Sequence, residues 1–133
     1  MRLKQGFLVI VFSIPLILYG QLIGKVVSVA DGDTFTMLID NRQVRIRLHG
    51  IDCPEKSQDF GQVAKEFTSG YVFGKVVTVV QMDIDRYGRT IGMVTINDIN
   101  VNEKLLEAGL AWHYTTYDRN PKWKAIEVAA KKE

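Results

Sequence analysis

The order of strand-like and helix-like segments is the feature that most limits how this chain can fold. Residues 22–30, 34–39 and 42–48 are rich in β-branched residues or alternate apolar with polar side chains, which predicts three strands. Only short turn sequences separate them, Asp-Gly-Asp at 31–33 and Asp-Asn at 40–41. Because these connections are so short, the three strands are predicted to form a meander.

The rest of the chain completes a known order of elements. The apolar period becomes helical over residues 62–73, residues 76–80 and 89–96 are predicted strands, and residues 101–109 and the stretch from Pro121 are predicted helices. Three strands, a helix, two strands and two helices is the pattern of an OB-fold. The sequence therefore predicts a mainly β protein with helices (α+β), a five-stranded OB-fold barrel with three helices.

The first predicted helix allows a more detailed expectation. Val63, Phe67 and Tyr71 fall on one stripe of it, so we expect this stripe to face the barrel. Gln58 or Asp59 is placed to cap its first turn.

The first twenty residues differ from the rest in composition. Arg2 and Lys4 form a short basic start, and residues 7–19 are apolar apart from one serine and one proline. A run this short suits the hydrophobic region of a signal peptide better than a membrane span. We expect residues 1–20 to be a signal peptide, or a membrane anchor if uncleaved, and residues 21–133 to be one secreted, periplasmic or cell-surface domain.

Composition excludes several simple kinds of site. Acidic and basic residues become equal in number once Arg2 and Lys4 are set aside, so any affinity for a polyanion must come from a local cluster. Cys53 is the only cysteine, which excludes an intrachain disulfide and a cysteine-based zinc site. The two histidines are too few for a histidine-rich metal site.

Carboxylates and arginines gather in three turn-rich segments, residues 31–34, 47–55 and 85–89. Carboxylate oxygens are the ligands that a hard divalent cation prefers, and the arginine fork matches phosphate oxygens. Taken singly, each segment also fits an ordinary turn or strand flank. Taken together, they favour metal-assisted hydrolysis of a phosphate ester. The residues concerned are Asp31, Asp33, Asp52 and Glu55 with Arg47 and Arg89.

These segments resemble the staphylococcal nuclease (thermonuclease) family. The likeness lies in Asp-Gly-Asp-Thr at 31–34, in Arg-Leu-x-x-Ile-Asp-x-Pro-Glu at 47–55 and in Asp-x-Tyr-Gly-Arg at 85–89, and it continues at 101–103 and 109–111. The resemblance implies an OB-fold nuclease that requires one Ca²⁺ ion and acts on DNA and RNA. It also implies cleavage of the 5′-O–P bond, which leaves 3′-phosphates.

The resemblance further implies roles for individual residues. Asp33 and Asp52 resemble the calcium-binding carboxylates, the Cys53 backbone carbonyl resembles a further ligand, and Asp31 resembles an acid just behind them. Glu55 resembles the general base.

Arg47 and Arg89 resemble the pair that binds phosphate in the transition state, and Tyr87 and Tyr117 resemble the tyrosines that flank the nucleotide. The expected protein is a monomer that contacts a membrane only through residues 1–20. Two other functions stay open at this point: a non-catalytic OB-fold module that binds nucleic acid or another polyanion, and a membrane-tethered calcium-binding interaction domain.

Overall fold

The computed structural model describes residues 4–6, 8–11, 20–116 and 118–131. Those described before residue 20 are exposed and belong to no helix or strand. Within the described ranges, no helix is long and apolar enough to cross a membrane. Most of the predicted signal segment, including residues 12–19, lies outside the described residues, and it stays a prediction.

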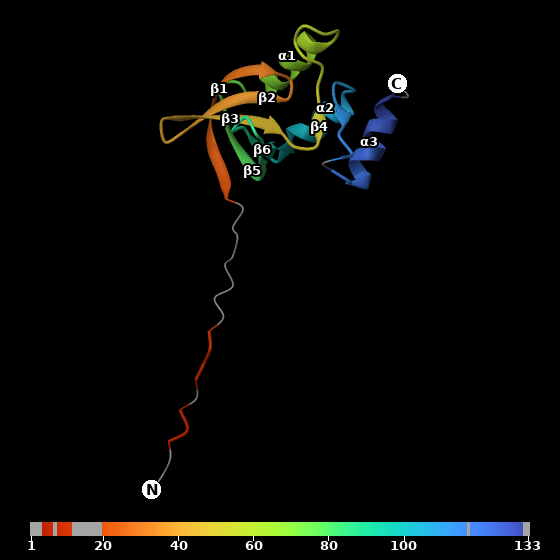
Figure 1. Cartoon of the computed structure of the whole chain (residues 1–133). Helices are drawn as coiled ribbons and strands as arrows, with labels where there is room; N and C mark the ends of the chain where they lie inside the picture. The colour runs from red at the N-terminus through yellow and green to blue at the C-terminus, as the bar shows by residue number, and fades with distance from the viewer. Residues whose placement is uncertain (1–3, 7, 12–19, 117, 132–133) are drawn as a thin grey trace.

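A closed five-stranded barrel forms the centre of the protein (Figure 1). Neighbouring strands run antiparallel in the order β3-β2-β1-β5-β6, and a parallel pairing of β3 with β6 closes the ring. This barrel confirms the OB-fold prediction, although β5 extends further than the sequence suggested. The barrel strands are β1 (Gln21–Asp31), β2 (Thr34–Ile39), β3 (Arg42–Leu48), β5 (Val76–Ile84) and β6 (Thr90–Ile96).

Three helices and three short strands complete the fold, and the helices lie to one side of the barrel (Figure 1). The helices are α1 (Gly61–Val72), α2 (Val101–Glu107) and α3 (Pro121–Lys131). A two-residue strand β4 (Ile51–Asp52) pairs with β8 (Trp112–His113), and β7 (Ile99–Asn100) extends the sheet beside β6. The β4–β8 pairing, which the sequence did not predict, ties the segment after β3 to the C-terminal part of the chain.

Helix α1 confirms the predicted stripe in part. Phe67 and Tyr71 are half-buried and pack against the core, whereas Val63 is half exposed. The fully buried positions Ala64, Thr68 and Val72 are each one residue further along the helix. The predicted side-chain cap is wrong, because Phe60 precedes the helix in a left-handed conformation and no side chain caps it. The Gln58 amide oxygen accepts the Glu55 backbone N–H instead.

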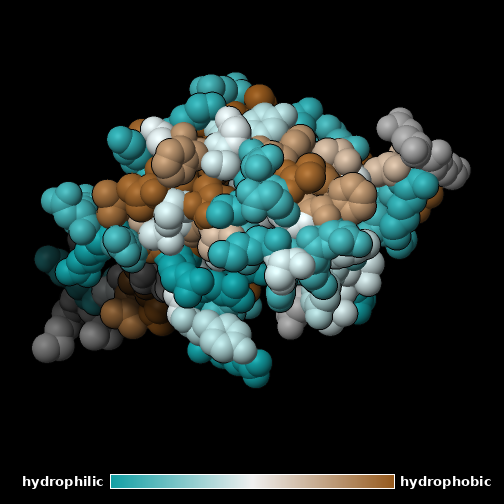
Figure 2. Space-filling model, turned by 90° about the horizontal axis from the view of Figure 1, so that it is seen from above, coloured by the Kyte–Doolittle hydropathy of each residue, from teal (hydrophilic) through white to brown (hydrophobic). Residues whose placement is uncertain are grey.

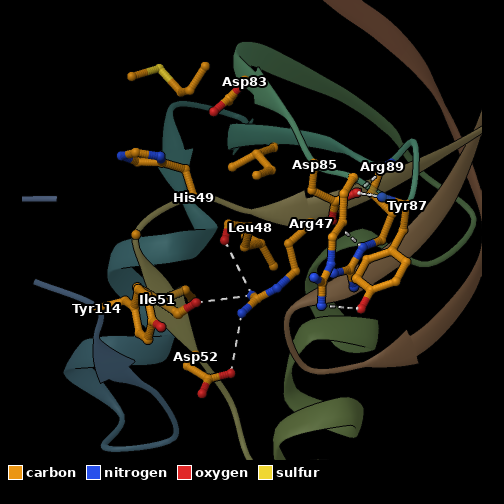
Figure 3. Close-up of a pocket in the computed structure, with 14 residues that line it drawn as sticks. Arg47, Leu48, His49, Ile51, Asp52, Asp83, Asp85, Tyr87, Arg89 and Tyr114 are labelled. Atoms are coloured by element: carbon orange, nitrogen blue, oxygen red, sulfur yellow. Dashed lines mark hydrogen bonds and ion pairs between the residues drawn. The ribbon is translucent and has the colours of Figure 1, made fainter. Parts of the chain in front are cut away.

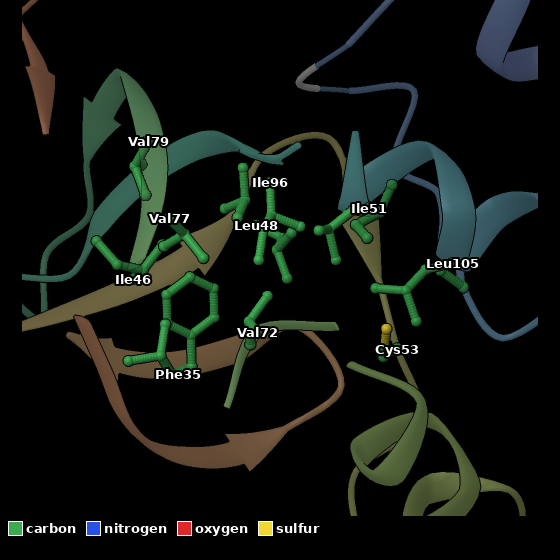
Figure 4. Packing of buried hydrophobic residues seen from close by; sticks show 14 of the residues in the cluster. Phe35, Ile46, Leu48, Ile51, Cys53, Val72, Val77, Val79, Ile96 and Leu105 are labelled. Atoms are coloured by element: carbon green, nitrogen blue, oxygen red, sulfur yellow. The ribbon is translucent and has the colours of Figure 1, made fainter. Parts of the chain in front are cut away.

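The hydrophobic core continues from the barrel interior to the helices (Figure 4). Phe35 and Leu48 fill the barrel, and Ile51 and Cys53 extend the core toward Leu105 of α2. Full burial of one such side chain contributes roughly 1.5–3 kcal/mol. The segment that bears the predicted acids after β3 is therefore anchored in the core rather than free in solvent.

The surface over the barrel is mixed in character. On the face seen in Figure 2, hydrophilic residues interrupt the hydrophobic ones among the described residues. Phe60 and Val63 at the start of α1 are among the exposed apolar residues. The core is therefore not continued on this face as one apolar surface.

Candidate active site

A pocket of about 210 Å³ brings together the acids and arginines singled out in the sequence. They come from the end of β1 and the turn after it, from β3, from β4 and the residues after it, and from the residue before β6. Three segments far apart along the chain thus meet at one end of the barrel, as the sequence led us to expect. The pocket is lined by Asp31, Asp33, Thr34, Arg47, Asp52, Cys53, Glu55 and Arg89.

Asp33 is held in place by hydrogen bonds from two segments. One carboxylate oxygen accepts the Thr34 hydroxyl (3.0 Å), and the other accepts the Cys53 backbone N–H (2.9 Å). Helix α1 holds the β1–β2 turn in place, because the Thr68 hydroxyl donates to the Gly32 carbonyl (2.5 Å). A side chain at Gly32 would also press on Ala64, because an added Cβ would lie 2.8 Å from the Ala64 Cβ. Asp33 is consequently a buried, rigidly placed carboxylate.

The end of β4 and the segment after it place a second and a third acid at the pocket. The Cys53 side chain is buried in the core, so Asp52 and Glu55 on either side of it are held close to the barrel. A Cβ at Gly61 would overlap the Glu55 carbonyl, so this close approach needs glycine. Glu55 is exposed, and its side chain has no hydrogen bond or ion pair among the described residues. It is therefore free to orient a water molecule.

The local charge of the pocket is negative, because four carboxylates face two guanidinium groups. Partial burial raises the pKa of Asp52 above its usual value, and the neighbouring carboxylates of Asp33 and Glu55 raise it further against the opposing effect of Arg47. An added cation would relieve this repulsion.

Arg47 crosses the pocket and contacts both sides of it. Its Nη1 donates to the Ile51 carbonyl (3.0 Å) and lies 3.1 Å from an Asp33 carboxylate oxygen, while Nη2 lies 3.2 Å from Asp52 Oδ1. The side chain is only 20% exposed. Arg47 therefore supports the site as well as providing positive charge to it.

Arg89 is oriented by the turn between β5 and β6. Its Nε donates to Asp85 Oδ2 (2.7 Å), and the other Asp85 oxygen accepts the backbone N–H groups of Tyr87 and Arg89. Partial burial acts to raise the pKa of Asp85, but these hydrogen bonds and the Arg89 charge outweigh it and hold the pKa below its usual value. Asp85 therefore stays ionised and paired with Arg89 to a lower pH than an ordinary aspartate.

A larger groove of about 800 Å³ adjoins the pocket (Figure 3). Arg47, Asp52 and Arg89 line both, so the groove leads directly to the acids. Tyr87 is 66% exposed in the groove wall, and the Arg86 guanidinium lies 4.9 Å from its ring centre and donates to its hydroxyl. The position of Tyr87 fits the predicted nucleotide contact, whereas Tyr117 lies outside the described residues.

Sequence reasoning missed part of the groove. Of the C-terminal aromatic residues Trp112, Tyr114 and Trp123, only Trp123 is fully buried. Trp112 is half exposed, and Tyr114 lines the groove (Figure 3). No periodicity distinguishes these aromatics in the sequence, because the two-residue strand β8 is too short to show one.

Cys53 and His49 do not form a nucleophilic pair. Burial raises the pKa of the Cys53 thiol, and the charge of Asp33 raises it further, so the reactive thiolate is suppressed. His49 instead contacts Asp118 (3.0 Å), which His113 also contacts (3.1 Å). These contacts connect the turn after β3 to the segment before α3.

The barrel and its pocket define an OB-fold protein in which acids and arginines meet at one rim. Residues 45–133 match the family model described as staphylococcal nuclease homologue. An uncharacterized endonuclease of Escherichia coli O157:H7 is 39% identical over 134 residues, which cover 100% of this chain and 87% of that protein. A micrococcal nuclease of Shigella flexneri is 32% identical over 128 residues, covering 90% of this chain and 72% of that protein.

A probable staphylococcal-like nuclease of Oryza sativa subsp. japonica is 42% identical over 94 residues, covering 68% of this chain and 28% of that protein. The chain therefore belongs to the staphylococcal nuclease family, as its sequence motifs indicated. Its relatives support a nuclease function, and hence a hydrolase.

Proposed function

We propose that the protein is an exported, Ca²⁺-dependent nuclease that hydrolyses phosphodiester bonds of DNA and RNA and leaves 3′-phosphates. The observation that supports this most is the meeting of four carboxylates and two arginines in one pocket that opens onto a groove. A protein that only binds phosphate has no use for so many carboxylates beside its arginines, since they repel the ligand. The export rests on the predicted signal segment alone, and the expected monomer stays a prediction.

The donor atoms at the pocket fit a calcium ion. Within the described part of the chain, no three acidic, cysteine or histidine side chains form a ready-made metal cluster. The proposed ligand set contains only two side chains, those of Asp33 and Asp52, and the Cys53 backbone carbonyl provides a third oxygen. Asp31 lies behind these ligands as a further acid. All four residues line the pocket. Burial is the main cause of the raised pKa of Asp52, and the nearby carboxylates of Asp33 and Glu55 add to it. All-oxygen ligands favour a hard cation, and such an ion supplies charge stabilisation for a phosphate oxygen.

The other side chains of the pocket and groove have separate roles in the proposed reaction. Glu55, exposed and without a partner in the described residues, aligns a water molecule and accepts its proton. Arg47 and Arg89 bind phosphate oxygens and stabilise the negative charge that accumulates in the transition state. Tyr87 and Arg86 hold the adjoining nucleotide in the groove, and Tyr117 is proposed to flank it as well.

Cleavage of a single-stranded DNA and a single-stranded RNA oligonucleotide tests the proposal. Each is incubated with the protein in Ca²⁺ and in excess chelator, and the product ends are identified by their sensitivity to phosphatase and by mass. We expect cleavage in Ca²⁺ only, with 3′-phosphate ends. Binding without cleavage would instead identify a non-catalytic nucleic-acid-binding module.

A further inference from the structure

The outer face of β3 carries a positive charge that the proposed active site does not use. Arg45 is exposed and lines neither the pocket nor the groove. Ile46 and Leu48 point into the core, so Arg45 and Arg47 both point outward from the same face of the strand. Two residues along a strand span about 6.6 Å, so Arg45 lies one such step beyond Arg47.

The strand register also places Arg45 beside Arg89. In the parallel pairing of β3 with β6, Ile46 lies opposite Thr90 and Arg47 lies opposite Ile91. Arg89 immediately precedes β6, so extending this register by one residue sets Arg45 next to Arg89. Arg45, Arg47 and Arg89 thus occupy adjacent positions on one face, with Arg45 furthest from the acids.

The charge of Arg45 is available to a ligand. Arg47 is engaged by two carboxylates and a carbonyl, and Arg89 is engaged by Asp85. Arg45, in contrast, has no hydrogen bond or ion pair among the described residues. The residue opposite it on β2 is Thr36, so this row of the sheet presents a hydroxyl rather than an acid.

We propose that Arg45 forms a second phosphate site, which binds the nucleic acid strand one phosphate beyond the bond that is cleaved. Neighbouring phosphates of an extended strand are separated by a distance similar to that between alternate residues of a β-strand. The face of strands 2 and 3 is also where OB-folds commonly bind oligonucleotides. The inference rests on the proposed nuclease function for its biological meaning, and it predicts a preference for polymeric substrates over mononucleotide esters.

Binding without turnover tests the site directly. A fluorescent single-stranded DNA of about 12 nucleotides is titrated with the protein in excess chelator, at several salt concentrations. We expect Arg45→Ala to weaken binding about fivefold and to reduce the slope of log Kd against log salt concentration by about 0.7, which is the value for one phosphate contact on a single strand. Arg45→Lys should retain most of the affinity.

Arg42→Ala is the matched control, because Arg42 is an exposed arginine of the same strand that lies next to the β2–β3 turn and alternates to the other side. It should leave both affinity and salt slope unchanged. Equal losses in Arg42→Ala and Arg45→Ala would overturn the proposal, since they would show a general charge effect. An unchanged affinity in Arg45→Ala would overturn it as well.

Cleavage in Ca²⁺ separates this proposal from the nuclease function. Arg45→Ala should raise KM for the oligonucleotide about fivefold while leaving kcat, and the hydrolysis of a chromogenic thymidine phosphate diester, within about twofold. If the parent protein cleaves neither substrate but Arg45→Ala still weakens binding, the nuclease function fails and the Arg45 site stands. If the parent cleaves both substrates and Arg45→Ala behaves like the parent, the nuclease function stands and the Arg45 site fails.

Discussion

Replacement of Arg47 by lysine is predicted to separate its structural role from its chemical role. The guanidinium donates to the Ile51 carbonyl at 3.0 Å and lies within 3.2 Å of both Asp33 and Asp52. A lysine keeps the positive charge but can reach only part of this set, because its charge is a single ammonium rather than a planar fork. An alanine leaves Asp33, which is 7% exposed, without its cation.

The magnitudes follow from these contacts. A hydrogen bond to a charged group contributes about 1.5–3 kcal/mol, and removal of one partner of a buried ion pair costs about 3–5 kcal/mol. Because Arg47 retains some exposure, we expect Arg47→Lys to lose about 1 kcal/mol of unfolding free energy and Arg47→Ala about 2–3 kcal/mol. The rate should fall about 10²–10³-fold in both variants, because a bidentate contact to the transition state is lost in each.

Urea unfolding and single-turnover cleavage of an oligonucleotide in Ca²⁺ measure the two effects separately. Arg42→Lys on the same strand is the control, and it should resemble the parent protein in both assays. A lysine variant with the parental rate would show that the fork at position 47 does not contact the transition state. An alanine variant as stable as the parent would refute the structural role.

Three further predictions concern acids at or near the site. Asp52→Asn should stabilise the fold at neutral pH by roughly 0.5 kcal/mol and should weaken Ca²⁺ binding. The reason is that the pKa of Asp52 is raised in the folded state, so its ionisation lowers the stability of the fold as pH rises past the usual value of 3.8. Equal stability at pH 7 in urea unfolding would contradict this. Asp118→Asn should destabilise the protein at neutral pH. Burial acts to raise the pKa of Asp118, but hydrogen bonds from Asn120 and two histidines outweigh this effect and lower the pKa. The stability that the Asp118 carboxylate contributes is therefore lost as pH falls below 3.8. A stability gap that stays constant down to about pH 3 would argue against it. Asp85→Asn should lower kcat about tenfold with a smaller change in KM, because Arg89 loses the carboxylate that orients it; an unchanged kcat would show that Arg89 needs no such support.

The barrel could be predicted from the sequence because its signals are local. Each strand is a run of β-branched or alternating residues, and short turns between the first three leave little freedom in how they pair. The convergence of the acids with Arg47 followed from the resemblance of the motifs to a family rather than from periodicity. The pocket confirms that these segments meet, while the chemical roles of the residues stay predictions.

The parts that the sequence did not predict depend on contacts between distant segments. The two-residue strands β4 and β8 have no pattern of their own and exist because Ile51 pairs with His113. The most buried positions of α1 lie one residue beyond the predicted stripe, and one of them, Thr68, donates its hydroxyl to the Gly32 carbonyl, a contact between distant segments. The inferred position of Arg45 next to Arg89 likewise depends on the parallel β3–β6 register, which the sequence does not show.

A crystal structure with Ca²⁺ and a nucleoside 3′,5′-bisphosphate tests the central claim most directly. We predict a single ion within about 2.6 Å of Asp33 and Asp52 oxygens and of the Cys53 carbonyl. We also predict that one phosphate of the ligand lies between that ion and the guanidinium groups of Arg47 and Arg89. An ion bound elsewhere, or a phosphate that contacts neither arginine, would contradict the account.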